Sequence, residues 1–146
     1  GPEAYNGLYV DGKPMPLLSP VVRLNQEIAS FGPALMKLDS LGAYHTAPLP
    51  YGAEAIPASC PVQISGGGDF VLGLFGSGSK PSAFMIVNRN YTQPAAATVT
   101  ISIPGRRVQE LDRRTGKWSR GQSPGANRTT EIKLAPGDGR LFRMAK

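Results

Sequence analysis

The acidic side chains are the first residues to weigh, because hydrolysis of a glycosidic bond uses two carboxyl groups held about 5–10 Å apart. Glu110 and Asp112 are separated by one residue, so on a strand their side chains would share one face. Both lie in a short, turn-bounded stretch beside Arg113 and Arg114. This neighbourhood favours a solvated ion-pair surface over a catalytic pair, and we expect no catalytic residue in this chain.

The chain has one histidine, His45, and one cysteine, Cys60. A single cysteine excludes an internal disulfide and any site with several cysteine ligands. His45 stands between Tyr44 and Thr46 and could orient a ligand, but a packing role is the favoured interpretation. Cys60 lies in an Ala/Ser/Pro loop without a nearby basic group that would activate the thiol. We therefore expect no metal site and no cofactor.

Aromatic side chains beside polar loops are stronger candidates, because the flat C–H faces of sugar rings can stack on an exposed aromatic ring. Trp118 is the only tryptophan and follows a Thr-Gly-Lys turn. Tyr91 lies in a polar loop in which Asn88 and Asn90 could bind hydroxyl groups, and Arg120 follows Trp118 closely. These five residues form the predicted ligand-binding set. The alternative for each aromatic is packing at the edge of the fold or against a neighbouring domain.

The net charge of +6 is unevenly distributed. Residues 1–105 carry a balance of −1, whereas residues 106–146 carry a balance of +7. A basic half could bind nucleic acid, but here acidic residues alternate with the basic ones, and the aromatic-basic pattern of RNA-binding sheets is missing. No apolar run approaches the roughly 20 residues of a membrane span. We therefore expect neither a nucleic-acid partner nor a membrane partner.

The elements that would position these residues are mostly short strands, separated by turns rich in the 18 glycines and 14 prolines. The clearest alternation of polar and apolar residues runs from Thr98 to Ile103. We predict strands at Gly42–Thr46, Pro61–Ser65, Phe70–Phe75, Ala83–Asn88, Thr98–Ile103, Val108–Asp112, Lys117–Arg120, Thr129–Leu134 and Arg140–Met144. The expected fold class is all-β, an antiparallel β-sandwich of about eight strands with one amino-terminal α-helix.

The expected helix begins at Ser19-Pro20, a favourable N-cap followed by proline at the first helical position. Apolar residues then recur at helical spacing up to Leu35, and Gly32-Pro33 should interrupt the helix. A further turn is expected from Ala34 to Leu38. We divide the chain into an amino-terminal segment with this helix, residues 1–40, and a β-sandwich domain, residues 41–146. Residues 1–2 resemble the scar of a cleaved purification tag.

Short motifs follow one another in a distinctive order: Gly7-Leu8, Asp11-Gly12-Lys13-Pro14, Arg23-Leu24-Asn25, Gly32-Pro33, Tyr44-His45-Thr46 and, near the end, Leu134-Ala135-Pro136-Gly137-Asp138-Gly139-Arg140-Leu141. This order resembles the carboxy-terminal β-sandwich region, with the last barrel helix, of a β-galactosidase-like glycoside hydrolase. The resemblance implies that the two barrel carboxylates would lie upstream of residue 1.

The resemblance and the aromatic residues together predict a non-catalytic carbohydrate-binding module of a bacterial glycoside hydrolase. It would bind plant or microbial polysaccharide or oligosaccharide by aromatic stacking. The alternative is a structural accessory domain that stabilises the glycosidase barrel and binds no ligand. In both cases the parent catalytic barrel is the expected protein partner. The resemblance implies a secreted or periplasmic parent enzyme, with any export signal outside this chain.

Overall fold

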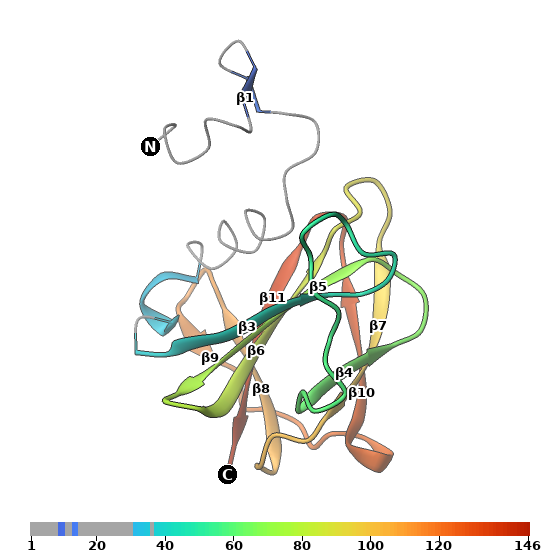
Figure 1. Ribbon diagram of the computed structural model, residues 1–146. Helices are drawn as coiled ribbons and strands as arrows, with labels where there is room; N and C mark the ends of the chain where they lie inside the picture. Colours follow the sequence, from blue (N-terminus) through green and yellow to red (C-terminus); the bar gives the residue numbers. More distant parts are fainter. Residues whose placement is uncertain (1–8, 11–12, 15–30, 36) are drawn as a thin grey trace.

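Two antiparallel sheets face each other in the computed structural model (Figure 1), which describes residues 9–10, 13–14, 31–35 and 37–146. The larger sheet has six strands in the order β3 (Asp39–His45), β5 (Phe70–Ser77), β6 (Lys80–Asn88), β11 (Gly139–Ala145), β8 (Arg107–Asp112) and β9 (Lys117–Trp118). The smaller sheet has the order β10 (Thr129–Leu134), β7 (Ala95–Ile101) and β4 (Val62–Ser65). A separate antiparallel pair joins β1 (Tyr9–Val10) and β2 (Lys13–Pro14).

This arrangement confirms the all-β, antiparallel sandwich class. Each strand predicted from the sequence overlaps one strand of the two sheets, from β3 to β11. The largest differences are at the beginnings of β3, β6 and β7, each of which starts three residues before the predicted start, and β9 ends at Trp118, two residues before the predicted end. After β9 the chain stays beside β8 through a hydrogen bond from the Ser119 N–H to the Glu110 carbonyl and through an isolated bridge between Val108 and Gln122.

The space between the sheets is filled by apolar side chains from every second position of the facing strands. In β7 the inward residues Ala97, Val99 and Ile101 are fully buried, and the threonines between them are only partly buried. Across the core, the rings of Phe84 and Phe142 stack with centroids 5.3 Å apart. The alternation seen in the sequence therefore separates the core face of this sheet from its outer face.

The outer face of the larger sheet is also apolar, unlike that of the smaller sheet. Val71, Met85 and Leu141 point away from the core between the sheets and form a second buried cluster. Phe31 and Leu35 belong to the same cluster. Because the central strands are buried on both faces, β5 and β6 read as continuous apolar runs rather than as alternating ones.

The predicted interruption at Gly32-Pro33 is confirmed. Gly32 has a φ of 48°, a left-handed conformation that a right-handed helix cannot continue through. A 3₁₀-helix, η2 (Gly32–Leu35), follows, and the Leu38 N–H donates to the Leu35 carbonyl to close the next turn. The part of the expected α-helix in residues 19–30 lies outside the described residues. A second 3₁₀-helix, η3 (Ala126–Arg128), precedes β10.

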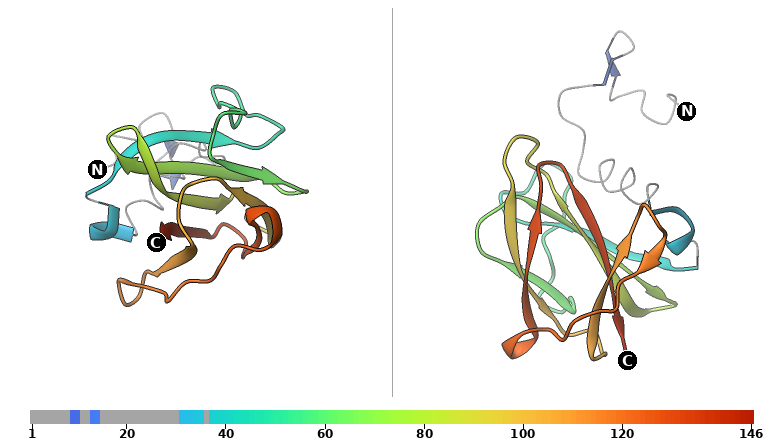
Figure 2. Two further views of the ribbon diagram at one scale, coloured as in Figure 1. Left: turned by 90° about the horizontal axis from the view of Figure 1, so that it is seen from below. Right: turned by 180° about the vertical axis from the view of Figure 1, so that it is seen from behind.

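No helical segment in the described part of the chain has both the length and the apolar character that a membrane crossing requires. Seen from behind, the hairpin of β8 and β9 lies beside η2 (Figure 2). The guanidinium carbon of Arg113 in this hairpin is 4.8 Å from the centre of the Phe31 ring. Phe31 thus joins the segment before β3 to the far edge of the larger sheet.

The stacked phenylalanines generate the first prediction. Phe84→Ala removes a fully buried ring and leaves a cavity, so we expect the free energy of unfolding to fall by about 3–5 kcal/mol. Urea denaturation followed by circular dichroism measures this change. Tyr51→Ala is the control, because Tyr51 is fully exposed and should change stability by less than about 0.5 kcal/mol. Similar losses in both variants would contradict the proposed core.

Candidate functional site

Three connections meet at one end of the sandwich. The loop between β6 and β7 (89–94) is joined to the turn between β10 and β11 (135–138), because the Gly137 N–H donates to the Asn90 carbonyl at 2.8 Å. Arg113, in the turn between β8 and β9, donates to the Asp138 carboxylate at 2.9 Å and to the Gly139 carbonyl. Loops held this way at the end of a β-sandwich are a common place for a binding site.

Asn88 and Asn90 build the first of these loops. Asn88 is 0% exposed, and its amide nitrogen donates to the carbonyls of Gln93 and Ala135. Its amide oxygen accepts the Asn90 N–H, and the Asn90 side chain in turn accepts the N–H groups of Thr92 and Gln93. Asn88 therefore shapes the loop from inside, where a ligand in solvent does not reach it.

Tyr91 stands on the same loop with 47% of its surface exposed. Tyr91 does not line either of the two cavities beside Trp118 that the described residues form. Tyr91 and Trp118 therefore do not line a common cavity, and the structure does not bring the predicted set together around one cavity.

Trp118 is half-buried at the edge of the larger sheet, on its outer face. The guanidinium carbon of Arg143 lies 4.2 Å from the centre of the indole ring, a cation–π contact. Arg143 lines a small cavity on one side of the indole, together with Ser82 and Lys37. On the other side Trp118 lines a larger cavity. The indole is therefore fixed in place but still accessible.

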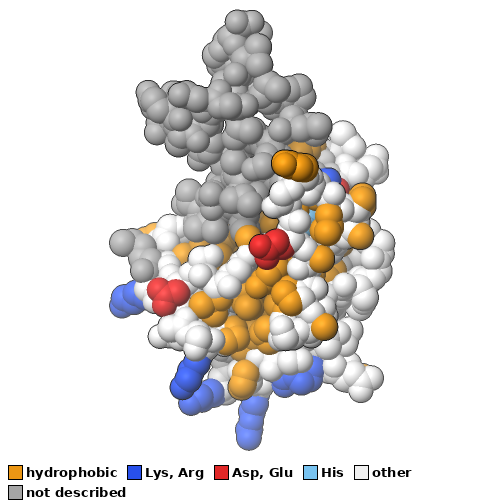
Figure 3. Space-filling model, viewed as in Figure 1, with side chains coloured by type: hydrophobic (Ala, Val, Ile, Leu, Met, Phe, Trp, Pro, Cys, Tyr) orange, Lys and Arg blue, Asp and Glu red, His pale blue; other side chains and the backbone are white. Residues whose placement is uncertain are grey.

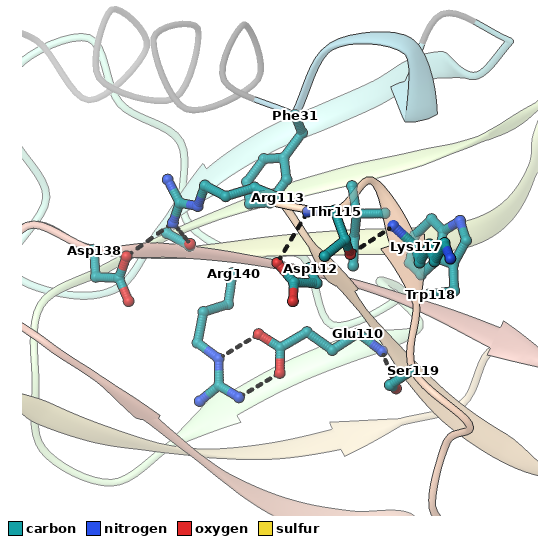
Figure 4. Close-up of a pocket in the computed structure, with 12 residues that line it drawn as sticks. Phe31, Glu110, Asp112, Arg113, Thr115, Lys117, Trp118, Ser119, Asp138 and Arg140 are labelled. Carbon is teal, nitrogen blue, oxygen red and sulfur yellow. Dashed lines mark hydrogen bonds and ion pairs between the residues drawn. The ribbon is translucent and has the colours of Figure 1, made fainter.

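The larger cavity, which we call the β8–β9 cavity, has a volume of about 520 Å³. Its lining is Phe31, Glu110, Leu111, Asp112, Arg113, Thr115, Lys117, Trp118, Ser119, Asp138, Gly139 and Arg140. Figure 4 shows that the Arg113–Asp138 pair and Trp118 lie on opposite sides of the view, with the Arg140–Glu110 pair between them. One aromatic ring and several charged hydrogen-bonding groups thus border one cavity.

The Arg140–Glu110 pair is the central polar contact of this cavity. The Arg140 Nε and Nη2 groups donate to the two Glu110 oxygens at 2.7 and 2.5 Å, a bidentate arrangement. The hydrogen bond to Glu110 raises the pKa of Arg140 above its already high value. The remaining Nη1 donates to the Lys133 carbonyl of β10 at 2.7 Å. Arg140 therefore connects the two sheets at their edge.

The expectation of an ion-pair surface around Glu110 is confirmed. The arginine that pairs with Glu110 is, however, not one of its sequence neighbours, Arg113 and Arg114. Arg113 pairs with Asp138, and Glu110 pairs with Arg140, which is 30 residues away in sequence. Asp112 accepts the backbone N–H of Arg114 and stabilises the hairpin turn. Sequence reasoning missed Arg140 and Asp138 as cavity residues, since only the pairing of β11 with β8 brings them beside Glu110.

Arg120 lies next to the β8–β9 cavity but not in it. It lines a second cavity of about 470 Å³, together with Gln122, Ser123 and Thr130. Of the predicted ligand-binding residues, Trp118 and Arg120 therefore border neighbouring cavities at the edge of the larger sheet. Of the other three, Asn88 is the last residue of β6, and Asn90 and Tyr91 belong to the loop that follows it.

His45 is held in a different polar cluster at the end of β3. It is 1% exposed, its Nδ1 contacts the Thr46 carbonyl, and its Nε2 lies 3.2 Å from Asp69 Oδ1. Asp69 also receives two hydrogen bonds from Arg89. A carbonyl only accepts, so the Nδ1 carries a proton, and the Nε2 faces the Asp69 carboxylate. These contacts fit the packing role expected of His45.

The environment of His45 lowers its pKa below the ordinary value, because burial disfavours the charged ring. The Thr46 carbonyl acts in the opposite direction, as does Asp69, whereas the charge of Arg89 lowers the pKa further. Burial raises the pKa of the Cys60 thiol, so this cysteine is not activated. Within the described residues, no three His, Cys, Asp or Glu side chains are grouped as metal ligands.

Comparison with models of known protein families, with curated proteins and with solved structures finds no match to this chain.

The lowered pKa of His45 predicts acid sensitivity. As the pH falls, the unfolded chain binds a proton at His45 near pH 6.5, and the folded protein binds it only at a lower pH. The stability that His45 contributes above pH 6.5 is therefore lost as the pH falls toward the pKa of the folded state. His45→Gln removes this group. Urea denaturation at pH 7, 6 and 5 should show a steeper loss for the unmodified protein, by up to about 1.4 kcal/mol per pH unit. Equal pH slopes in the two proteins would refute the prediction.

Proposed function

We propose that this chain is a non-catalytic carbohydrate-binding module of a glycoside hydrolase and that the β8–β9 cavity is its ligand site. The observation that carries the proposal is the position of Trp118, the only tryptophan, in the wall of a cavity bordered by charged hydrogen-bonding side chains. A sugar offers an apolar ring face and several hydroxyl groups, and this lining offers a partner for each. The resemblance to β-galactosidase-like enzymes points to the same class of ligand.

The size and rigidity of the cavity support this proposal. A volume of about 520 Å³ lies within the range of about 300–1,000 Å³ that small-molecule sites occupy. Arg143 braces the indole from the side of the smaller cavity, and the Arg113–Asp138 pair fixes the opposite wall. A ligand entering such a site meets groups that are already positioned, which lowers the entropic cost of binding.

The proposal includes no hydrolysis, because Glu110 and Asp112 already accept hydrogen bonds from other groups of the protein. Both oxygens of Glu110 accept hydrogen bonds from Arg140, and Asp112 accepts the hairpin N–H groups. A catalytic carboxyl group must be free to exchange a proton with the substrate or to attack it, and these two carboxylates already have partners within the protein. In the proposal, the catalytic carboxylates belong to a barrel that precedes this chain.

The second candidate is a structural accessory domain that binds no ligand, and a specific observation favours it. Phe31 and Leu35, from the segment that resembles the last barrel helix, are buried against the outer face of the larger sheet. Figure 3 also shows hydrophobic side chains gathered over β3, a surface suited to a protein neighbour.

Removal of the indole separates the two candidates. Trp118→Ala should weaken glycan binding by about 5- to 150-fold, because stacking on one aromatic ring contributes about 1–3 kcal/mol in nucleic-acid complexes. Isothermal titration calorimetry with neutral and acidic polysaccharides measures the change. Tyr91→Ala is the matched control and should bind like the unmodified protein. If no glycan binds, or if Trp118→Ala binds unchanged, the accessory function replaces the carbohydrate-binding one.

A second prediction concerns catalysis. The isolated chain should release no product from a panel of aryl glycosides and polysaccharides, since Glu110 is held in an ion pair and Asp112 in the hairpin turn. The release of nitrophenol or of reducing ends measures turnover. Hydrolysis that disappears in Glu110→Gln or Asp112→Asn would show instead that this chain contains an active site.

A further inference from the structure

The β8–β9 cavity and the cavity beside Arg120 share part of their lining. Glu110, Ser119 and Arg140 border both. The Ser119 hydroxyl accepts the Glu110 N–H at 2.9 Å, and the Ser119 N–H donates to the Glu110 carbonyl at 2.8 Å, so the shared wall is well ordered by hydrogen bonds. The two cavities therefore adjoin along the Arg140–Glu110 pair at the edge of the larger sheet. We call the two together the edge groove.

We infer that the edge groove is a cleft for an extended, neutral oligosaccharide, with one sugar at Trp118 and a further sugar at Arg120 and Gln122. The inference rests on the proposed function and adds to it a second subsite and a class of ligand. Each half of the groove, at about 520 and 470 Å³, is large enough for about one sugar ring with its hydroxyl groups.

The second subsite offers hydrogen-bonding groups that the fold does not use. Among the described residues, the Arg120 guanidinium and the Gln122 side-chain amide have no hydrogen-bond or ion-pair partner, and both side chains are exposed. The backbone of Gln122 is nevertheless fixed, because it exchanges two hydrogen bonds with Val108, at 2.8 and 3.0 Å. Phe142 and Ile132, both buried, provide an apolar floor below these groups. A sugar ring with hydroxyls at its rim fits this pattern.

Arg140 acts in this arrangement as the divider between the two subsites. Its side chain donates hydrogen bonds to Glu110 and to the Lys133 carbonyl. These bonds hold it in place, so it forms a fixed wall between the two subsites. Its guanidinium carbon also lies 5.4 Å from the centre of the Phe142 ring, which supports it from below. A linear chain of sugars that crosses this divider would contact both subsites at once.

The charge of the groove indicates a neutral ligand, although the whole chain carries +6. The charged groups of the β8–β9 cavity are three carboxylates and three cations: Glu110, Asp112, Asp138, Arg113, Lys117 and Arg140. The second cavity has Glu110 and Glu131 against Arg120 and Arg140. Equal numbers of opposite charges, with Arg113–Asp138 and Arg140–Glu110 in ion pairs, give little attraction for a polyanion.

The test is the dependence of affinity on ligand length. Isothermal titration calorimetry would use β-1,4-linked glucose, xylose, mannose and galactose, each from one to six units, with oligogalacturonate as the acidic probe. For the neutral sugar that binds, we expect at least about a tenfold gain from one unit to three and a plateau beyond. Gln122→Ala should weaken binding of the trimer by about 2- to 10-fold, the effect of one lost hydrogen bond, and leave the monomer unchanged.

Gln93→Ala is the matched control, because Gln93 is an exposed glutamine on the loop after β6 and lies outside the groove. It should leave both affinities unchanged, and thermal unfolding verifies that each variant is folded. Equal affinity for one unit and three, an unchanged trimer affinity in Gln122→Ala, or a preference for oligogalacturonate would overturn the second subsite while leaving sugar binding at Trp118 intact. Absence of binding to every sugar would overturn the proposed function itself.

Discussion

The central strands of the larger sheet are buried on both faces, and the rest of the molecule depends on this constraint. One face of β5, β6 and β11 packs against the smaller sheet, and the other face packs within the cluster that includes Phe31 and Leu35. Because both faces are apolar, the register of these strands depends on how individual side chains pack on each face and not on an alternation of polar and apolar residues. The edge strands β8 and β9 can therefore carry polar and charged groups without a loss of the fold.

The difference in width between the two sheets explains where the candidate site lies. Three strands cannot cover six, so the smaller sheet ends at β10 while the larger one continues through β8 to β9. The cavity beside Arg120 forms in this uncovered region, between β10 and the β8–β9 hairpin. Arg140 is suited to this boundary, since its long side chain reaches both Glu110 on β8 and the Lys133 carbonyl on β10.

The predicted ligand-binding residues show how a local pattern can indicate a polar surface without revealing its use. Asn88 and Asn90 were selected for their hydrogen-bonding groups, and the structure uses those groups to build the loop after β6. Trp118 is indicated by its position after a turn and Arg120 by its nearness to Trp118, and both border the groove. The difference arises because an asparagine in a turn often bonds to its own backbone, whereas a tryptophan has a single donor and a large ring.

The sequence by itself determined the fold class, the positions of the strands from β3 to β11, the break at Gly32-Pro33 and the ionic character of the surface around Glu110. These features follow from nearest neighbours: alternation along a strand, turn residues between strands and the conformational freedom of one glycine. Only the tertiary structure decided that Arg140 pairs with Glu110 and that Phe31 reaches the β8–β9 hairpin. Such contacts join residues that are 30 or more positions apart, and they depend on strand order and register, which no local pattern specifies.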